Sequence, residues 1–286
     1  MATATTAHPI SGDKLYQKRA RAALPILVRQ AEAATPISYS SLAQELGMPN
    51  PRNLNFVLGS IGQTLERLQL KKERPIPPIQ CLVVNKTTGL PGDGIGWFVV
   101  KKEDFSKLSL KRRREIVQSE LQRIYAYSNW QDLLEELNLE PLAQDFTPEL
   151  NAASSFYGSG ESKEHRELKE FVAKHPTTIG LPHATPKGKT EVRLASGDCL
   201  DISFRTKSTW IAAEIKSVIS PPSDIARGIF QCVKYRAVLD AELLSKSQPQ
   251  NSRAILVLGG CMPSHLIPLA NILGVEFVQC ITAAKG

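Results

Sequence analysis

The chain has 286 residues, of which 42% are hydrophobic, and it carries a formal net charge of +7. This length and composition exclude a largely disordered chain and leave room for two globular domains. No run approaches the roughly 18 apolar residues that a membrane-spanning helix needs, and the basic balance favours a polyanionic partner such as nucleic acid.

The beginning of the chain and its cysteines indicate the compartment. Residues 1–13 have neither a basic start nor an apolar run, so we expect a short disordered arm and no signal peptide. The 5 cysteines stand at positions 81, 199, 232, 261 and 280, without close spacing. Such spacing favours buried thiols over disulfides or a zinc site. We therefore expect a cytoplasmic, intracellular protein, associated with the nucleoid if the source is bacterial.

The first domain is predicted to be a winged helix-turn-helix. A helix from Lys14, bent or begun at Pro25, precedes two short helices that run from Ile37 to Gly47 and from Arg52 to Leu65. Strands at 79–84 and 97–100, separated by a glycine-rich turn, would form the wing. In such a domain the second helix enters the major groove of double-stranded DNA. The side chains expected to contact DNA from its first turns are Arg52, Asn53 and Asn55.

The same region resembles the C-terminal DNA-binding domain of the O6-alkylguanine alkyltransferases and their alkyltransferase-like relatives. The residues that carry the resemblance are Ile37-x-Tyr39, Leu42-Ala43, Leu46-Gly47, Arg52, the run from Pro78 to Val84 and the turn from Gly89 to Gly94. The family's acceptor cysteine falls on Gln80, which cannot act as a sulfur nucleophile, and strand alternation turns Cys81 to the opposite face. The resemblance therefore implies DNA binding without alkyl transfer. Arg52 is either the residue that occupies the space of an extruded base or an exposed residue of a helix start.

Residues 101–160 are predicted to form a helical connector and a linker. A basic run at its start either neutralises DNA phosphates or forms a solvated helix face; it includes Lys111, Arg112 and Arg113. One helix is predicted from Leu110 to Leu139, and its aromatic stripe favours core packing over base stacking. From Glu140 to Gly160 the composition turns to proline, alanine, serine, asparagine and glycine, as in a linker.

Two short strands of the last third of the chain carry a candidate metal site. Strands at 199–204 and 210–216, joined tightly through Thr206 to Thr209, are expected to lie antiparallel. Strand alternation places Glu214 and Lys216 on one face, and Asp201 on the neighbouring strand could share a cation with Glu214. Two carboxylates with otherwise open positions are typical of Mg²⁺ ligation, and Mn²⁺ is an expected substitute.

These residues resemble the PD-(D/E)xK, or restriction-endonuclease-like, nucleases. Asp201 followed by Glu214-x-Lys216 matches the core motif, although Leu200 stands where the family name implies proline. Gly197-x-x-x-Asp201 and Gln231-x-x-x-Tyr235 resemble motifs of the branch typified by recombination-associated exonucleases. The resemblance implies two metal ligands, Asp201 and Glu214, a water-positioning Lys216, and bracing of substrate or water by Gln231 and Tyr235.

The first helix of this domain supplies a further expectation. In the nuclease family a glutamate of this helix often reaches the metal, which implies Glu164, or else Glu167, as an auxiliary ligand. Each could instead be an ordinary acidic residue at a helix start. His165 between them is expected to be a surface or packing residue. Gln231 and Tyr235 lie on one helix face, which could alternatively be a solvated face.

The predicted fold is α/β, with a winged helix-turn-helix domain at 14–100, the connector at 101–160 and a nuclease domain at 161–286. In the last domain the order helix, three strands, helix, strand, helix, strand indicates a mixed sheet flanked by helices. We expect an Mg²⁺-dependent endonuclease acting on double-stranded DNA in restriction, anti-phage defence or repair of modified DNA. The alternative is a non-catalytic DNA-binding regulator or damage sensor. A double-strand cut would need two active sites, which a homodimer could supply.

Overall fold

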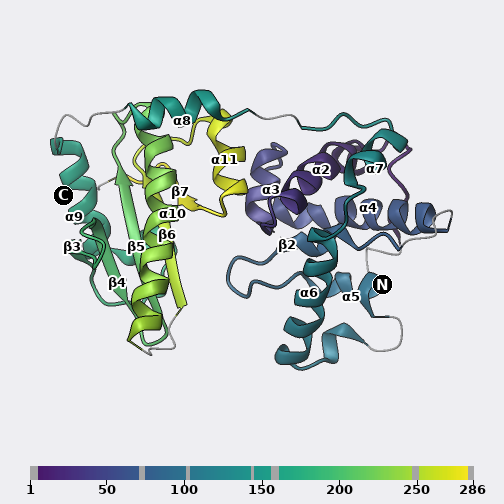
Figure 1. Cartoon of the computed structure of the whole chain (residues 1–286), viewed down its shortest axis with the longest axis horizontal. Coiled ribbons are helices and arrows are strands. Elements are labelled where there is room, and N and C mark those ends of the chain that lie inside the picture. Colours follow the sequence, from purple (N-terminus) through teal and green to yellow (C-terminus); the bar gives the residue numbers. More distant parts are fainter. Residues whose placement is uncertain are drawn as a thin grey trace. The chain divides into compact units, whose positions relative to one another are not determined.

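The computed structural model describes residues 6–70, 75–100, 104–142, 145–155, 161–246 and 251–282. The chain divides into two compact units, Met1–Gln144 and Asp145–Gly286. The described residues form helices and a mixed sheet (Figure 1), which confirms the predicted α/β class. None of the described helices is long and apolar enough to cross a membrane.

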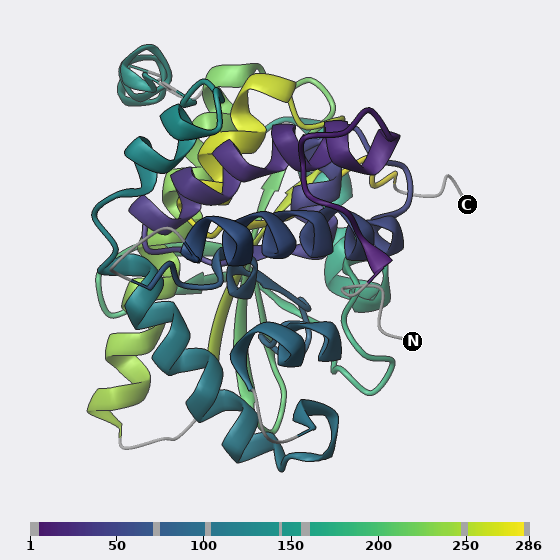
Figure 2. The ribbon, with the colours of Figure 1, turned by 90° about the vertical axis from the view of Figure 1, so that its right-hand side faces the viewer.

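The first unit is mainly helical. Its α-helices and strands are α2 (Leu15–Glu32), β1 (Ile37–Ser38), α3 (Tyr39–Glu45), α4 (Leu54–Gln69), β2 (Val83–Val84), α5 (Gly96–Val99), α6 (Leu110–Tyr125) and α7 (Trp130–Glu136), and its 3-10 helices are η1 (Pro51–Asn53), η2 (Ile79–Leu82), η3 (Asp93–Ile95) and η4 (Phe105–Lys107). Figure 2 shows α2 and α4 running side by side, and their apolar faces meet in one core. Pro25 lies inside α2, which begins ten residues earlier at Leu15 and continues through it.

The predicted strand pair of the wing is wrong. Residues 79–82 form the 3-10 helix η2, and only Val83–Val84 are extended, pairing in parallel with Ile37–Ser38. Residues 96–99 form the helix α5, in which the Val100 N–H donates to the Gly96 carbonyl at 3.0 Å. A short apolar run without polar alternation fits a strand or a buried helical turn equally well. In both segments local hydrogen bonds stabilise the helical turn.

The helices predicted as a connector belong to the first unit instead. Side chains of both α6 and α7 lie in the core that α2 and α4 form. The predicted single helix from Leu110 to Leu139 is interrupted between Tyr125 and Trp130. The Trp130 indole N–H donates to the Ile124 carbonyl at 3.0 Å, which satisfies an acceptor at the end of α6. Trp130 is 2% exposed, so core packing, as predicted, is its role.

The predicted disordered arm is wrong for residues 6–13, whereas residues 1–5 lie outside the described residues. Ala7 and Ile10 are buried. The Ser60 hydroxyl of α4 donates to the His8 carbonyl at 2.6 Å, and the Ile10 N–H donates to the Thr64 hydroxyl at 3.0 Å. This segment therefore packs along α4.

The second unit is built on a five-stranded sheet in the order β3-β4-β5-β6-β7. Its elements are α8 (Thr147–Ser154), α9 (Lys163–Lys174), η5 (Pro176–Ile179), β3 (Lys189–Arg193), β4 (Cys199–Arg205), β5 (Thr209–Lys216), α10 (Pro222–Ser245), β6 (Asn251–Leu258), η6 (Ser264–Leu266), α11 (Ile267–Ile272) and β7 (Glu276–Val278). From α9 onward this is the predicted order of helices and strands. The strands β3, β4 and β5 are antiparallel, whereas β5, β6 and β7 are parallel.

Two apolar layers hold helices against the sheet. In Figure 1 α10 lies along the sheet, and its buried residues pack on one face in a cluster with Ala212 and Leu256. The other layer includes Ile211 and Val257, against which α9 packs through Leu168 and Val172. Because β5 is covered on both faces, it is almost entirely buried. Charged residues in such a strand require a specific role.

Candidate active site where two strands separate

Asp201 and Glu214 lie where β4 and β5 separate. The ladder between these strands ends at the pair Ile202 and Ala213, and the next step of the register places Asp201 opposite Glu214. The Asp201 carboxylate accepts a hydrogen bond from the Ile215 N–H at 2.8 Å, so a side chain takes the place of the missing backbone acceptor. Neighbouring positions on antiparallel strands hold side chains within interaction distance. The two carboxylates therefore meet at one end of the sheet.

Lys216 lies beside this carboxylate pair, as strand alternation predicts. Its Nζ is 3.1 Å from Glu214 Oε1 and 2.8 Å from Asp224 Oδ1. Glu214 is 3% exposed and Lys216 is 6% exposed. The Lys216 ammonium is thus fixed by two carboxylates inside the unit, where it has little freedom to move.

Gln231 and Tyr235 project from one side of α10 toward the same place. Lys216 Nζ donates to Gln231 Oε1 at 3.3 Å, and Gln231 Nε2 contacts the Tyr235 hydroxyl at 3.4 Å. The Tyr235 hydroxyl donates to the Cys199 carbonyl of β4 at 3.2 Å. Both side chains are therefore part of the site and do not form a solvated face.

Two further residues near the start of α10 shape the site, and neither was identified from the sequence as a site residue. Asp224 lies within the first turn, after Pro221 at the N-cap, and its carboxylate binds Lys216. At Gly228 a Cβ atom would lie 2.8 Å from Lys216 Cε and from Leu256 Cδ1. The absent side chain lets the Lys216 stem pass under α10, so a larger residue here would displace the ammonium.

Helix α9 presents His165 to the site in place of the predicted glutamate. His165 Nε2 is 3.5 Å from Asp201 Oδ1. Glu164 is exposed, and Glu167, also exposed, pairs with Lys163 at 3.7 Å. The buried residues of α9 are Leu168, Lys169, Val172 and Ala173. His165 precedes them by three, four, seven and eight residues and so lies at the centre of this face, whereas Glu164 lies at its edge. This helical phase was the signal in the sequence that identifies His165.

The charges at the site change the pKa values of its members. Burial and the neighbouring Asp201 carboxylate raise the pKa of Glu214 to about 7. Burial lowers the pKa of Lys216, but the charges of Glu214 and Asp224 outweigh this effect and raise it above its ordinary value. The hydrogen bond to Asp201 raises the pKa of His165. The two facing carboxylates thus favour any additional positive charge, whether a proton or a metal cation.

The raised pKa of Glu214 predicts that the metal-free protein becomes less stable as the pH rises. The pKa of this side chain is about 7 in the folded chain and 4.5 ordinarily. Between these values the unfolded chain releases the proton that the folded chain retains. The contribution of Glu214 to the free energy of unfolding is therefore complete below pH 4.5 and is lost as the pH rises to 7. This contribution is about 3 kcal/mol. We expect Glu214→Gln to remove it, so urea unfolding in EDTA should show the variant gaining stability relative to the native chain at pH 8 but not at pH 4.5. An equal difference at both pH values would contradict this.

The donor set suits a hard divalent cation. Asp201 and Glu214 offer carboxylate oxygens, and the described residues contain no group of three His, Cys, Asp or Glu side chains that could hold a metal ion. Mg²⁺ prefers one or two carboxylates and fills its other positions with water and phosphate oxygens. A soft-metal centre, which needs several sulfur or imidazole ligands, does not fit the described residues.

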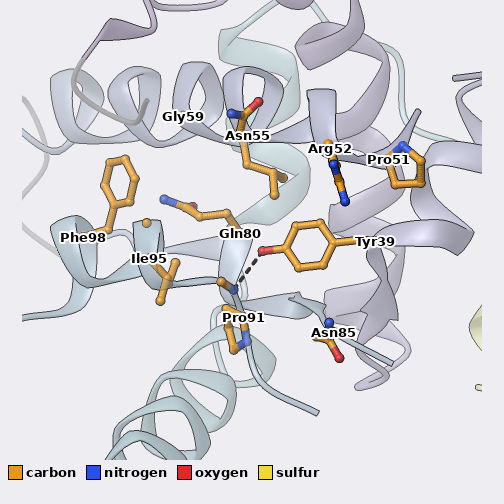
Figure 3. Close-up of a pocket in the computed structure, with 13 residues that line it drawn as sticks. Tyr39, Pro51, Arg52, Asn55, Gly59, Gln80, Asn85, Pro91, Ile95 and Phe98 are labelled. Carbon is orange, nitrogen blue, oxygen red and sulfur yellow. Dashed lines mark hydrogen bonds between the residues drawn. The ribbon is translucent and has the colours of Figure 1, made fainter. Parts of the chain in front are cut away.

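The side chains predicted to contact DNA are largely exposed on the first unit. Arg52 and Asn53 lie in η1 and Asn55 lies in the first turn of α4, and all three are exposed. Arg52, Asn55 and Gln80 line a pocket of this unit (Figure 3). On α6, Lys111 is exposed and Arg112 pairs with Glu115 at 3.3 Å. Arg113 has a role within the unit, because its guanidinium binds Asp93 at 3.1 Å and lies over the Phe105 ring. Arg113 therefore braces the turn that precedes α5.

Gly197 has a structural explanation as well as a place in the motif. It lies in the turn from β3 to β4 with φ +85°, a conformation that favours glycine. This turn sets the start of β4, and four residues later the chain reaches Asp201.

Comparisons with family models, with curated proteins and with solved structures gave no match to this chain.

Proposed function

We propose that the chain is a divalent-cation-dependent nuclease that hydrolyses phosphodiester bonds in DNA. The observation that carries this proposal is the placement of Lys216 at 3.1 Å from Glu214, on the strand next to Asp201 and at the end of the sheet. Two carboxylates and one amine at such a position combine metal ligation with a fixed positive charge. This combination suits attack of water on a phosphodiester.

Each residue has a chemical role in this proposal. Asp201 and Glu214 would hold the cation, which when bound would polarise the scissile phosphate and make a water molecule more acidic. Lys216 would orient the attacking water and offset the negative charge that develops on the phosphate. Asp224 and Gln231 keep the ammonium in place through their contacts at 2.8 Å and 3.3 Å. His165 would orient the Asp201 carboxylate.

DNA is the proposed substrate because of the charge and the exposed side chains of the first unit. The chain has a net charge of +7, and exposed basic and amide side chains lie at the start of α4. Such groups contact phosphates and base edges. Cutting in restriction, anti-phage defence or repair of modified DNA would use a binding unit of this kind.

Incubation of the full chain with supercoiled plasmid in Mg²⁺ tests the proposal. We expect nicked or linear DNA with Mg²⁺ or Mn²⁺ and intact plasmid in EDTA. Plain plasmid and plasmid with alkylated or mismatched bases should be compared, since the binding unit sets the target. Binding of these DNAs without cleavage in either metal would instead identify a non-catalytic DNA-binding regulator or damage sensor.

A further inference from the structure

The predicted burial of the cysteines is wrong for three of the five. Cys81 and Cys232 are buried, whereas Cys199, Cys261 and Cys280 are exposed, and all five are free thiols. An exposed thiol is accessible to oxidants. Two of these exposed thiols, Cys261 and Cys280, lie against each other in the second unit, at a place that the proposed hydrolysis does not use.

The two sulfur atoms are close enough for a covalent bond to form with little movement. Cys261 Sγ and Cys280 Sγ lie 2.9 Å apart, although the two residues are 19 positions apart in the chain. A disulfide has an S–S distance of about 2.05 Å, so the sulfurs would need to approach by less than about 1 Å. A displacement of this size is comparable with ordinary thermal motion.

Backbone contacts hold the two cysteines together. Cys261 follows β6, and Cys280 follows β7 at the edge of the sheet. The Cys280 N–H donates to the Gly260 carbonyl at 2.8 Å, and the Met262 N–H donates to Gln279 Oε1 at 2.8 Å. Both neighbours of Cys261 are therefore tied to the segment that contains Cys280. The proximity of the thiols is set by the fold and does not depend on side-chain rotation alone.

Cys280 also has a backbone conformation that cysteine seldom adopts. Its φ is +58°, in the left-handed region that favours glycine. Glycine would suit the backbone better at this position. A cysteine here therefore indicates a role for the side chain, and the nearby Cys261 sulfur identifies its partner.

We propose that Cys261 and Cys280 are a redox modification site, at which hydrogen peroxide forms a disulfide that thiol reductants can open again. In the first step the Cys261 sulfur attacks one peroxide oxygen. An S–O bond forms, the O–O bond breaks, and the thiol proton leaves with the other oxygen as water. The Cys280 sulfur then attacks the resulting sulfenic acid, so that the S–S bond forms, the S–O bond breaks and a second water leaves. The two thiols together lose two electrons, and one peroxide is reduced to two water molecules.

The order of the two steps follows from the contact between the thiols. The hydrogen bond to Cys261 raises the pKa of the Cys280 thiol, so this thiol is disfavoured as the attacking thiolate. Cys261 is therefore the expected site of the first oxidation, and Cys280 supplies the second sulfur. Exposed disulfides are the ones that reductants open readily, which fits a reversible modification.

The disulfide would fasten one edge of the sheet. The strand β7 has three residues and pairs with β6. Linking two residues 19 positions apart restricts the unfolded chain. We therefore expect oxidation to raise the melting temperature of the second unit by several °C. This inference does not depend on the chain being a nuclease.

Peptide mapping after oxidation tests the proposal. The full chain in EDTA is treated with hydrogen peroxide, its free thiols are blocked with N-ethylmaleimide in urea, and it is digested with trypsin. Both cysteines fall in the tryptic peptide 254–285, and a glutamyl endopeptidase that cuts after Glu276 separates them. We expect two fragments that stay joined until dithiothreitol is added. Three thiols should be blocked in the oxidised chain, in place of the 5 of the reduced chain.

Three serine variants make the result specific. Cys261→Ser and Cys280→Ser should each give separate fragments and no rise of the melting temperature with peroxide, and using both keeps the test valid if one folds poorly. Cys199→Ser is the matched control, because Cys199 is exposed and contacts Glu191 at 3.5 Å. It should form the Cys261–Cys280 bond and show the native rise of the melting temperature.

Three outcomes would overturn the proposal. The first is that all thiols remain free under peroxide conditions that oxidise dithiothreitol. The second is a disulfide that involves Cys199 or joins two chains, which a non-reducing gel would show. The third is an unchanged melting temperature after the Cys261–Cys280 bond has formed. None of these measurements uses DNA cleavage, so each outcome leaves the nuclease proposal standing.

Discussion

Replacing Asp201 by asparagine is expected to lower DNA cleavage by about a thousandfold or more, because a metal ligand is lost. The variant keeps an amide oxygen that can still accept the Ile215 N–H, which Asp201 accepts at 2.8 Å. The end of β4 should therefore stay folded. What changes is the charge opposite Glu214, so affinity for Mg²⁺ should fall together with cleavage.

Three measurements make this result specific. Plasmid cleavage, Mg²⁺ titration by calorimetry and DNA binding by fluorescence anisotropy should be compared for the native chain and Asp201→Asn. Asp240→Asn is a matched control, since Asp240 is exposed on α10 and accepts a hydrogen bond from Ser252 at 2.5 Å. We expect DNA binding to be retained by both variants. Cleavage by Asp201→Asn at the native rate would show that the carboxylate pair is not the catalytic centre.

Lys216→Gln should lower cleavage by about a hundredfold to a thousandfold while the metal site is kept. Glutamine can still bond to Asp224 and Gln231, which hold the native ammonium at 2.8 Å and 3.3 Å. It cannot supply the positive charge beside the reacting phosphate. Because Lys216 lowers the pKa of Glu214, the variant should retain the Glu214 proton to higher pH. Its Mg²⁺ affinity should therefore be weaker at pH 7 and recover toward pH 8.5.

The control for this variant is Lys234→Gln, on α10. Lys234 is exposed and pairs with Asp198 at 2.7 Å, so the same change of residue type leaves the site unaltered. Cleavage rates should be measured at saturating Mg²⁺ and at both pH values. If Lys216→Gln regained native cleavage at pH 8.5, the amine would act only through the protonation of Glu214, and its proposed role on the attacking water would be wrong.

The sequence predicts the second unit well because its patterns are local. Alternation along β5 places Glu214 and Lys216 together, and the tight connection after β4 sets the register that brings Asp201 opposite them. The error at Glu164 has an equally physical cause. A helix start rich in acidic residues does not show which of its faces is buried. His165 is distinguished from Glu164 only when Ala173 is considered together with Leu168 and Val172, because His165 precedes these three by three, seven and eight residues.

The first unit was harder to predict because its short apolar runs have no clear period. Residues 97–100 suit a strand or a helical turn, and hydrogen bonding after folding selects the turn. Ala7 and Ile10 pack against α4. This is a contact between residues far apart in the sequence, and the largely polar segment around them gives no pattern from which it could be predicted. Gln80 is the extreme case, since its buried side chain has no hydrogen-bond partner among the residues that the structure describes, and this depends on the folded surroundings and not on a local sequence pattern.

The amide at position 80 lies in η2, next to a cysteine that is fully buried. An exposed thiol can be consumed by an alkylating or oxidising agent, whereas an amide makes only reversible contacts. Repeated encounters with such agents would therefore leave this part of the chain unmodified.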